Sequence, residues 1–111
     1  MSKLAVRTWE FQAKVVTVDS GDRITVDVEA SPWSERLLTI NLADIKAPSL
    51  DEDKGRVARD ALSVMLPKGA TFRVVGYHFE KYNTLKAIIY HPDIAMSVNN
   101  WMVASGYAVP V

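Results

Sequence analysis

The 111-residue chain contains no cysteine, so it can form neither a disulfide nor a thiolate metal site. It also has no excess of either charge, because thirteen lysines and arginines balance thirteen aspartates and glutamates. A protein that wraps nucleic acid through its phosphates usually carries a clear basic excess. No apolar run approaches membrane-spanning length, and the first residues lack the apolar stretch of a secretory signal. We therefore expect a cytoplasmic protein with no membrane partner.

The size and composition of the chain are those of one folded domain. A length of 111 residues suits a single hydrophobic core. Apolar residues make up 49% of the sequence, and the charges are spread along it, which is typical of an ordered protein rather than a disordered one. We expect a short arm at residues 1–8 and one domain at residues 9–111.

Runs rich in β-branched residues, several of them alternating between apolar and polar, predict five strands. The expected strands are residues 11–18, 24–29, 37–45, 71–77 and 85–90. Between the third and the fourth, apolar residues recur at helical spacing from 57 to 66, after an acidic cluster that favours a helix start. Pro67 and Gly69 end that helix.

Residues 97–105 predict a second helix that follows the last strand. Val98, Trp101, Met102 and Ala104 are expected to face inward, and Gly106 stands where a left-handed C-terminal cap belongs. The order β-β-β-α-β-β-α is the plan of a five-stranded OB-fold, a small Greek-key barrel with helices. The sequence therefore predicts this α+β barrel.

Residues 39–49 read T-I-N-L-A-D-I-K-A-P-S, which resembles the third strand and following turn of the staphylococcal nuclease family, V-R-L-x-G-I-D-A-P-E. Three more segments resemble that family in the same order. Residues 16–24 are similar to V-x-D-G-D-T-I, residues 80–87 to D-K-Y-G-R-x-L-A, and residues 96–108 to V-N-x-x-L-V-x-x-G-x-A. The resemblance implies the nuclease form of the OB-fold over nearly the whole chain.

The same resemblance implies that catalysis has been lost. Active members use three carboxylates around Ca²⁺ and two arginines on the scissile phosphate. Only Asp22, at the first metal-ligand position, is retained. Lys46 and Ser49 stand at the second ligand and general-base positions, and Asn41 and Thr84 replace the arginines. Lys46 would repel a cation at Asp22 and could instead form a salt bridge with the Asp22 carboxylate. We therefore expect no cofactor.

Some nucleotide-binding residues of the family are matched. Lys81 and Tyr82 correspond to a Lys-Tyr pair that contacts a terminal nucleotide phosphate, and with Arg23 they form a predicted nucleotide-binding remnant. Arg23 and Lys81, together with Lys46 and Lys86, could form a basic patch that binds nucleic acid weakly.

The preferred function is an inactive binding or regulatory module. A protein partner is favoured over nucleic acid because the net charge is zero. Trp9 and Trp33 are candidate exposed anchors for a partner, whereas Trp101 is expected in the core. The apolar segment 107–111 allows self-association.

The alternative is a residual metal-dependent nuclease. It would use Ca²⁺ or Mg²⁺ in a rebuilt site that joins Asp22 to Asp44, Asp51 or Asp53. Two weaker metal-site hypotheses are the histidine pair His78 and His91, which lacks a third ligand at convincing spacing, and the acidic run at residues 51–53. Strand ends and a solvated helix start are the simpler interpretations of these residues.

Overall fold

The computed structural model describes residues 8–28 and 36–111. Residues 1–7 of the predicted arm, and Trp33, lie outside this part of the chain. The elements in chain order are β1 (Trp9–Ser20), β2 (Arg23–Asp27), β3 (Leu37–Leu42), β4 (Ile45–Lys46), α1 (Asp53–Met65), β5 (Thr71–Lys81), β6 (Thr84–Tyr90), α2 (Val98–Ala104) and β7 (Val109–Pro110).

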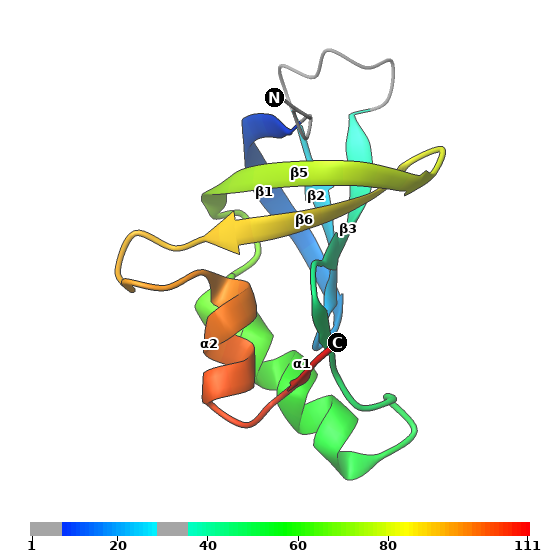
Figure 1. Ribbon diagram of the computed structural model, residues 1–111, viewed down its shortest axis with the longest axis vertical. Coiled ribbons are helices and arrows are strands. Elements are labelled where there is room, and N and C mark those ends of the chain that lie inside the picture. Colours follow the sequence, from blue (N-terminus) through cyan, green and yellow to red (C-terminus); the bar gives the residue numbers. More distant parts are fainter. Residues whose placement is uncertain (1–7, 29–35) are drawn as a thin grey trace, which may run out of the picture.

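Five strands close into a barrel in the spatial order β1-β2-β3-β6-β5 (Figure 1). Neighbouring strands are antiparallel except β3 and β6, which run parallel. Every second residue points into the barrel, so that Val26, Ile40 and Leu85 are fully buried. The predicted α+β architecture of a five-stranded barrel with two helices is confirmed, and it is consistent with an OB-like barrel.

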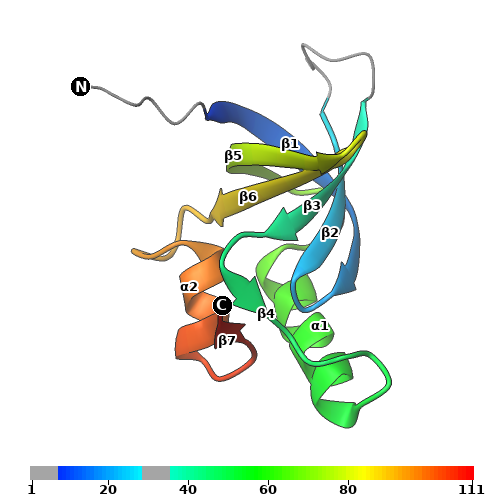
Figure 2. The ribbon, with the colours of Figure 1, turned by 45° about the vertical axis from the view of Figure 1, so that its right-hand side comes forward.

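Both helices lie at one end of the barrel, as both views show (Figures 1 and 2). Helix α1 buries Ala58 and Leu62, and Leu66 at its C-cap, against the barrel core. Gly106 directly follows the C-cap of α2 with a φ of 83°, as expected for a left-handed cap, and Gly69 has a φ of 88° in the turn after α1. No helix among the described residues combines the length and apolar character needed to cross a membrane.

The predicted strand over residues 37–45 is interrupted. Asp44 adopts a φ of 66°, which turns the chain between β3 and β4. Strand β4 then pairs with β7, which the sequence did not predict, and Lys46 lies opposite Val109 (Figure 2). Pro110 makes β7 a poor strand by local rules, so only its pairing with β4 identifies it. The apolar segment 107–111 is thus partly used within the chain.

Two inward or outward predictions are wrong. Ala104 is exposed, because it lies on the side of its helix that faces away from the barrel. Trp9 is not an exposed anchor, since it begins β1, is half-buried, and packs on Phe79 with 5.3 Å between ring centroids. Trp101 packs against the core as predicted, although it is only partly buried.

Asn99 joins α2 to the barrel from a buried position. Its side-chain amide donates to the carbonyls of Ala43 at 3.0 Å and Ala87 at 3.1 Å, and its Oδ1 accepts from the backbone N–H of Ile89 at 3.1 Å. These bonds satisfy three backbone groups at the junction of β6, the β3–β4 turn and α2. Asn99 therefore fixes the turn that leads into β4.

Candidate functional site

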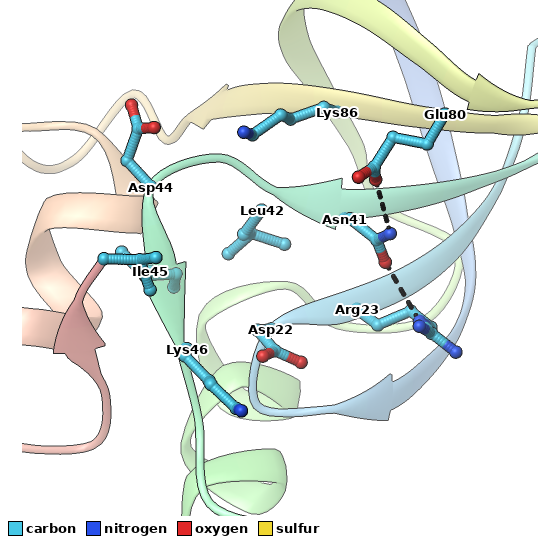
Figure 3. Close-up of a pocket in the computed structure, with 10 residues that line it drawn as sticks. Asp22, Arg23, Asn41, Leu42, Asp44, Ile45, Lys46, Glu80 and Lys86 are labelled. Atoms are coloured by element: carbon cyan, nitrogen blue, oxygen red, sulfur yellow. Dashed lines mark hydrogen bonds between the residues drawn. The ribbon is translucent and has the colours of Figure 1, made fainter.

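A hollow of about 380 Å³ opens where the start of β2, the end of β3 and β4 meet (Figure 3). We call it the charged hollow, because most of its lining residues are ionised. It is lined by Asp22, Arg23, Asn41, Leu42, Asp44, Ile45, Lys46, Glu80, Lys86 and Val111.

Asp22 stabilises the wall of this hollow. Its Oδ1 accepts a hydrogen bond from the Ser20 hydroxyl at 2.7 Å, and its Oδ2 accepts one from the backbone N–H of Ala47 at 3.0 Å. The carboxylate thus ties the β1–β2 turn to the chain that follows β4. The predicted salt bridge with Lys46 is absent from the ion pairs of the described residues.

A chain of hydrogen bonds crosses the opposite wall. Arg23 and Asn41 are cross-strand partners on β2 and β3, and Arg23 Nε donates to Asn41 Oδ1 at 2.9 Å. The amide of Asn41 donates in turn to Glu80 Oε1 at 2.7 Å (Figure 3). The terminal nitrogens of the Arg23 guanidinium have no hydrogen-bond partner among the described residues, so they can donate to a ligand.

Three cations reach the charged hollow from three different strands. Arg23 comes from β2, Lys46 from β4 and Lys86 from β6. None of them forms an ion pair within the described part of the chain. The predicted basic patch is therefore partly assembled. The charges of Asp22, Asp44 and Glu80 balance these cations, so the hollow has no net formal charge.

Asp44 also affects a neighbouring phenol. Burial raises the pKa of Tyr77 above its ordinary value, and the negative charges of Tyr90, when ionised, and of Asp44 add to this shift. Asp44 therefore acts electrostatically on residues of β5 as well as on the hollow that it lines.

The other predicted site residues lie elsewhere. Ser49 precedes α1, and its hydroxyl accepts from the backbone N–H of Asp51 at 3.2 Å. Thr84 lies opposite Thr39 at the start of β6, and does not line the charged hollow. Lys81 and Tyr82 lie at the β5–β6 hairpin, so the structure brings neither into the hollow with Arg23.

Glu80 is the lining residue that the sequence interpretation missed. It precedes the Lys-Tyr pair in the family motif but has no assigned role there. Its contact with Asn41 spans 39 positions in sequence, so no local signal reveals it. The parallel pairing of β3 with β6, which places the β5–β6 hairpin beside Thr39 of β3, is the feature that would have indicated it.

The metal-site hypotheses are not supported by the geometry. No group of three or more His, Asp or Glu side chains in residues 8–28 and 36–111 could hold a metal ion. His78 lies opposite Lys86, whereas His91 follows Tyr90 at the far end of the same strand pair, about 15 Å away at about 3.3 Å per residue. His91 instead accepts from the backbone N–H of Asp93 at 3.0 Å.

The acidic residues 51–53 lie at the start of α1, where two of them have structural roles. Glu52 is the N-cap of α1, and Asp53 in the first turn pairs with Arg56. An acidic first turn stabilises a helix through its dipole. The functional interpretation therefore depends on the charged hollow.

A comparison with models of protein families finds none that matches this chain, and a comparison with curated proteins finds no match either.

Proposed function

We propose that this chain is a divergent staphylococcal-nuclease-like OB-fold that has lost catalysis and acts as a binding or regulatory module. The observation that carries the proposal is the environment of Asp22. Both oxygens of this carboxylate accept hydrogen bonds from within the protein, and a lysine lines the same hollow. A hard cation such as Ca²⁺ needs several oxygen ligands, and the positive charge of Lys46 disfavours a cation beside Asp22.

The substitutions at the catalytic positions support the same proposal. Asn41 uses its amide to join Arg23 to Glu80, and Lys46 brings a positive charge to the position of the second metal ligand. The side chain of Ser49 cannot act as a base at neutral pH. Each lost electrostatic partner typically reduces the rate by about two to three orders of magnitude, though these losses are not additive.

The charge distribution favours a protein partner over nucleic acid. The three cations of the charged hollow face three carboxylates, and the chain as a whole has no net charge. A phosphate backbone gains most from an excess of cations along its path. A protein surface, which carries charges of both signs, complements such a hollow better.

A cleavage assay tests the loss of catalysis. The purified chain is incubated with single-stranded DNA, double-stranded DNA and RNA, with Ca²⁺ or Mg²⁺ and with a chelator. The matched variant is Asp22→Asn, which retains one hydrogen-bond acceptor for the Ala47 N–H. We expect no cleavage above the level of this variant.

Two results would contradict this reading. Metal-dependent cleavage that disappears in Asp22→Asn would support the alternative function, a residual nuclease with a site rebuilt around Asp22 and Asp44. Tight oligonucleotide binding that weakens steeply with salt, without cleavage, would replace the protein partner with nucleic acid.

A further inference from the structure

A second depression lies beside the charged hollow, between the chain after β4 and the turn after α2. It consists of two hollows, of about 510 and 320 Å³, which share Pro48, Lys54, Gly106 and Tyr107 in their linings. We call these two hollows together the apolar groove. Lys46 lines both the apolar groove and the charged hollow, so the two depressions meet at this residue.

Apolar side chains form much of this groove. Ala47 and Ala108 are buried at its base, and Tyr107 is half-buried beside them. Val57 of α1 and Val109 of β7 line it while remaining 54% and 60% exposed. Covering such side chains with the apolar groups of a ligand removes apolar surface from water and is favourable. The groove therefore suits apolar side chains of a ligand.

The charged hollow offers hydrogen-bond donors to a ligand. The Nε of Arg23 donates to Asn41, and its two terminal nitrogens have no hydrogen-bond partner among the described residues, so they can donate to a ligand. The ammonium groups of Lys46 and Lys86 have no ion-pair partner among the described residues. Guanidinium and ammonium groups together bind a carboxylate well.

The acidic residues limit what the ligand can be. Asp22 and Glu80 already accept hydrogen bonds from within the protein, whereas Asp44 is exposed in the charged hollow. Glu52 and Asp53 line the apolar groove further along, together with a single additional cation, Lys54. A ligand with a negative charge at every step would meet these carboxylates, so a single acidic group followed by apolar groups fits better than a nucleic acid.

We propose that the charged hollow and the apolar groove together bind one extended protein segment. Its carboxylate side chain lies beside Arg23 and Lys46, and its apolar side chains cover Tyr107, Val57 and Val109. The proposal rests on the proposed function, of which it names the partner chemistry. The sharing of Lys46 by the two depressions is the observation that makes one ligand sufficient for both.

The experiment uses a displayed library of random peptides of about 12 residues, which reach about 40 Å when extended. Peptides selected on the immobilised full chain are synthesised, and their dissociation constants are measured by fluorescence polarisation. We expect the selected peptides to share an acidic residue followed by apolar residues.

Two pairs of matched variants locate the binding surface. Val57→Lys introduces a charge into the apolar groove, and Val64→Lys places the same charge on the same helix, at a side chain that is 82% exposed and does not line the groove. Lys46→Gln removes the shared cation, and Lys68→Gln removes a cation from the exposed turn after α1. Urea unfolding establishes that each variant is folded.

We expect Val57→Lys and Lys46→Gln to weaken peptide binding roughly tenfold or more, about 1.4 kcal/mol per tenfold, with less than about twofold change in the two controls. Failure to enrich any peptide, or equal binding by Val57→Lys and Val64→Lys, would overturn the proposal. Concentration-dependent dimerisation that Val57→Lys abolishes would assign the groove to a second copy instead.

Oligonucleotide binding that depends on Lys46 but not on Val57 would assign the charged hollow to nucleic acid and also overturn the proposal. These outcomes are separate from the cleavage assay. A chain that cleaves no nucleic acid but selects no peptide retains the proposed loss of catalysis and loses only this partner.

Discussion

The two asparagines Asn41 and Asn99 use the same side-chain chemistry in two different surroundings. Asn99 is 2% exposed and bonds three backbone groups of neighbouring segments. Asn41 is only partly buried and bonds two charged side chains, Arg23 and Glu80, that water can also reach. A hydrogen bond contributes most when its loss leaves a buried group unsatisfied. The junction at Asn99 should therefore determine stability, and the hollow at Asn41 should determine recognition.

The largest expected effect is that of Asn99→Ala. Truncation leaves the N–H of Ile89 and the carbonyl of Ala43 without their partner, and the Ala87 carbonyl keeps only the Ala43 N–H as a donor, so we expect the free energy of unfolding to fall by about 2–4 kcal/mol. Urea denaturation measures this change. The matched control is Asn100→Ala, an exposed asparagine on the same helix, which should change it by less than about 0.5 kcal/mol. Equal effects of the two variants would contradict the role given to Asn99.

Gly21→Ala tests the packing behind the charged hollow. A Cβ at this position would lie 2.7 Å from the Cβ atoms of both Ala47 and Ala58. Neither of these atoms can move away by rotating a side chain, so the backbone must shift, and we expect a loss of about 1–3 kcal/mol. A double variant with Ala58→Gly should recover part of that loss in urea unfolding. Strictly additive effects would mean that the close approach to Ala58 is not the cause.

Asn41→Ala should have a much smaller effect on stability, about 0.5 kcal/mol or less, because water can replace its two hydrogen bonds. Its effect should appear at Arg23, whose Nε loses its partner. By NMR, we expect the Arg23 Nε–H to be protected from solvent exchange in the unmodified chain and to exchange faster in the variant. A stability loss as large as that of Asn99→Ala would remove the distinction between the two regions.

The smallest effect concerns pH. Because the pKa of Tyr77 is raised in the folded chain, the unfolded chain releases the phenol proton first as the pH rises. The neutral phenol therefore contributes stability below the ordinary pKa of 10.0, and this contribution is lost as the pH rises through the folded-state pKa. Tyr77→Phe should therefore lose less stability than the unmodified chain between about pH 8 and about pH 11. Urea unfolding at both pH values measures the difference. An identical pH dependence of the two proteins would contradict the shift.

Local patterns were sufficient for most of the secondary structure. Alternation predicted the strand that became β2, and helical spacing followed by glycine predicted α1 and α2. The unpredicted strand β7 lacks such a pattern, because a two-residue strand that contains Pro110 exists only by pairing with β4. Ala104 was expected to face inward but is exposed, because the inward side of α2 is defined by where the barrel lies.

The residues of the candidate site were likewise predicted only in part. The sequence singled out Asp22, Asn41 and Lys46, and the structure brings them into one hollow. The resemblance also grouped Thr84 and Lys81 with them, but the structure places neither in that hollow. The sequence did not predict Glu80 as a site residue, because its contact with Asn41 joins strands that are far apart in the chain.

The sequence by itself determined most of the elements, their order and the side-chain types at residues 22, 41, 46, 49 and 84, since each of these depends on residues within one or two turns or strands. Only the tertiary structure decided which charges meet. The parallel pairing of β3 with β6 brings Glu80 to Asn41, and the pairing of β4 with β7 places Lys46 between the charged hollow and the apolar groove. Such pairings depend on the closure of the whole barrel, which no short stretch of sequence encodes.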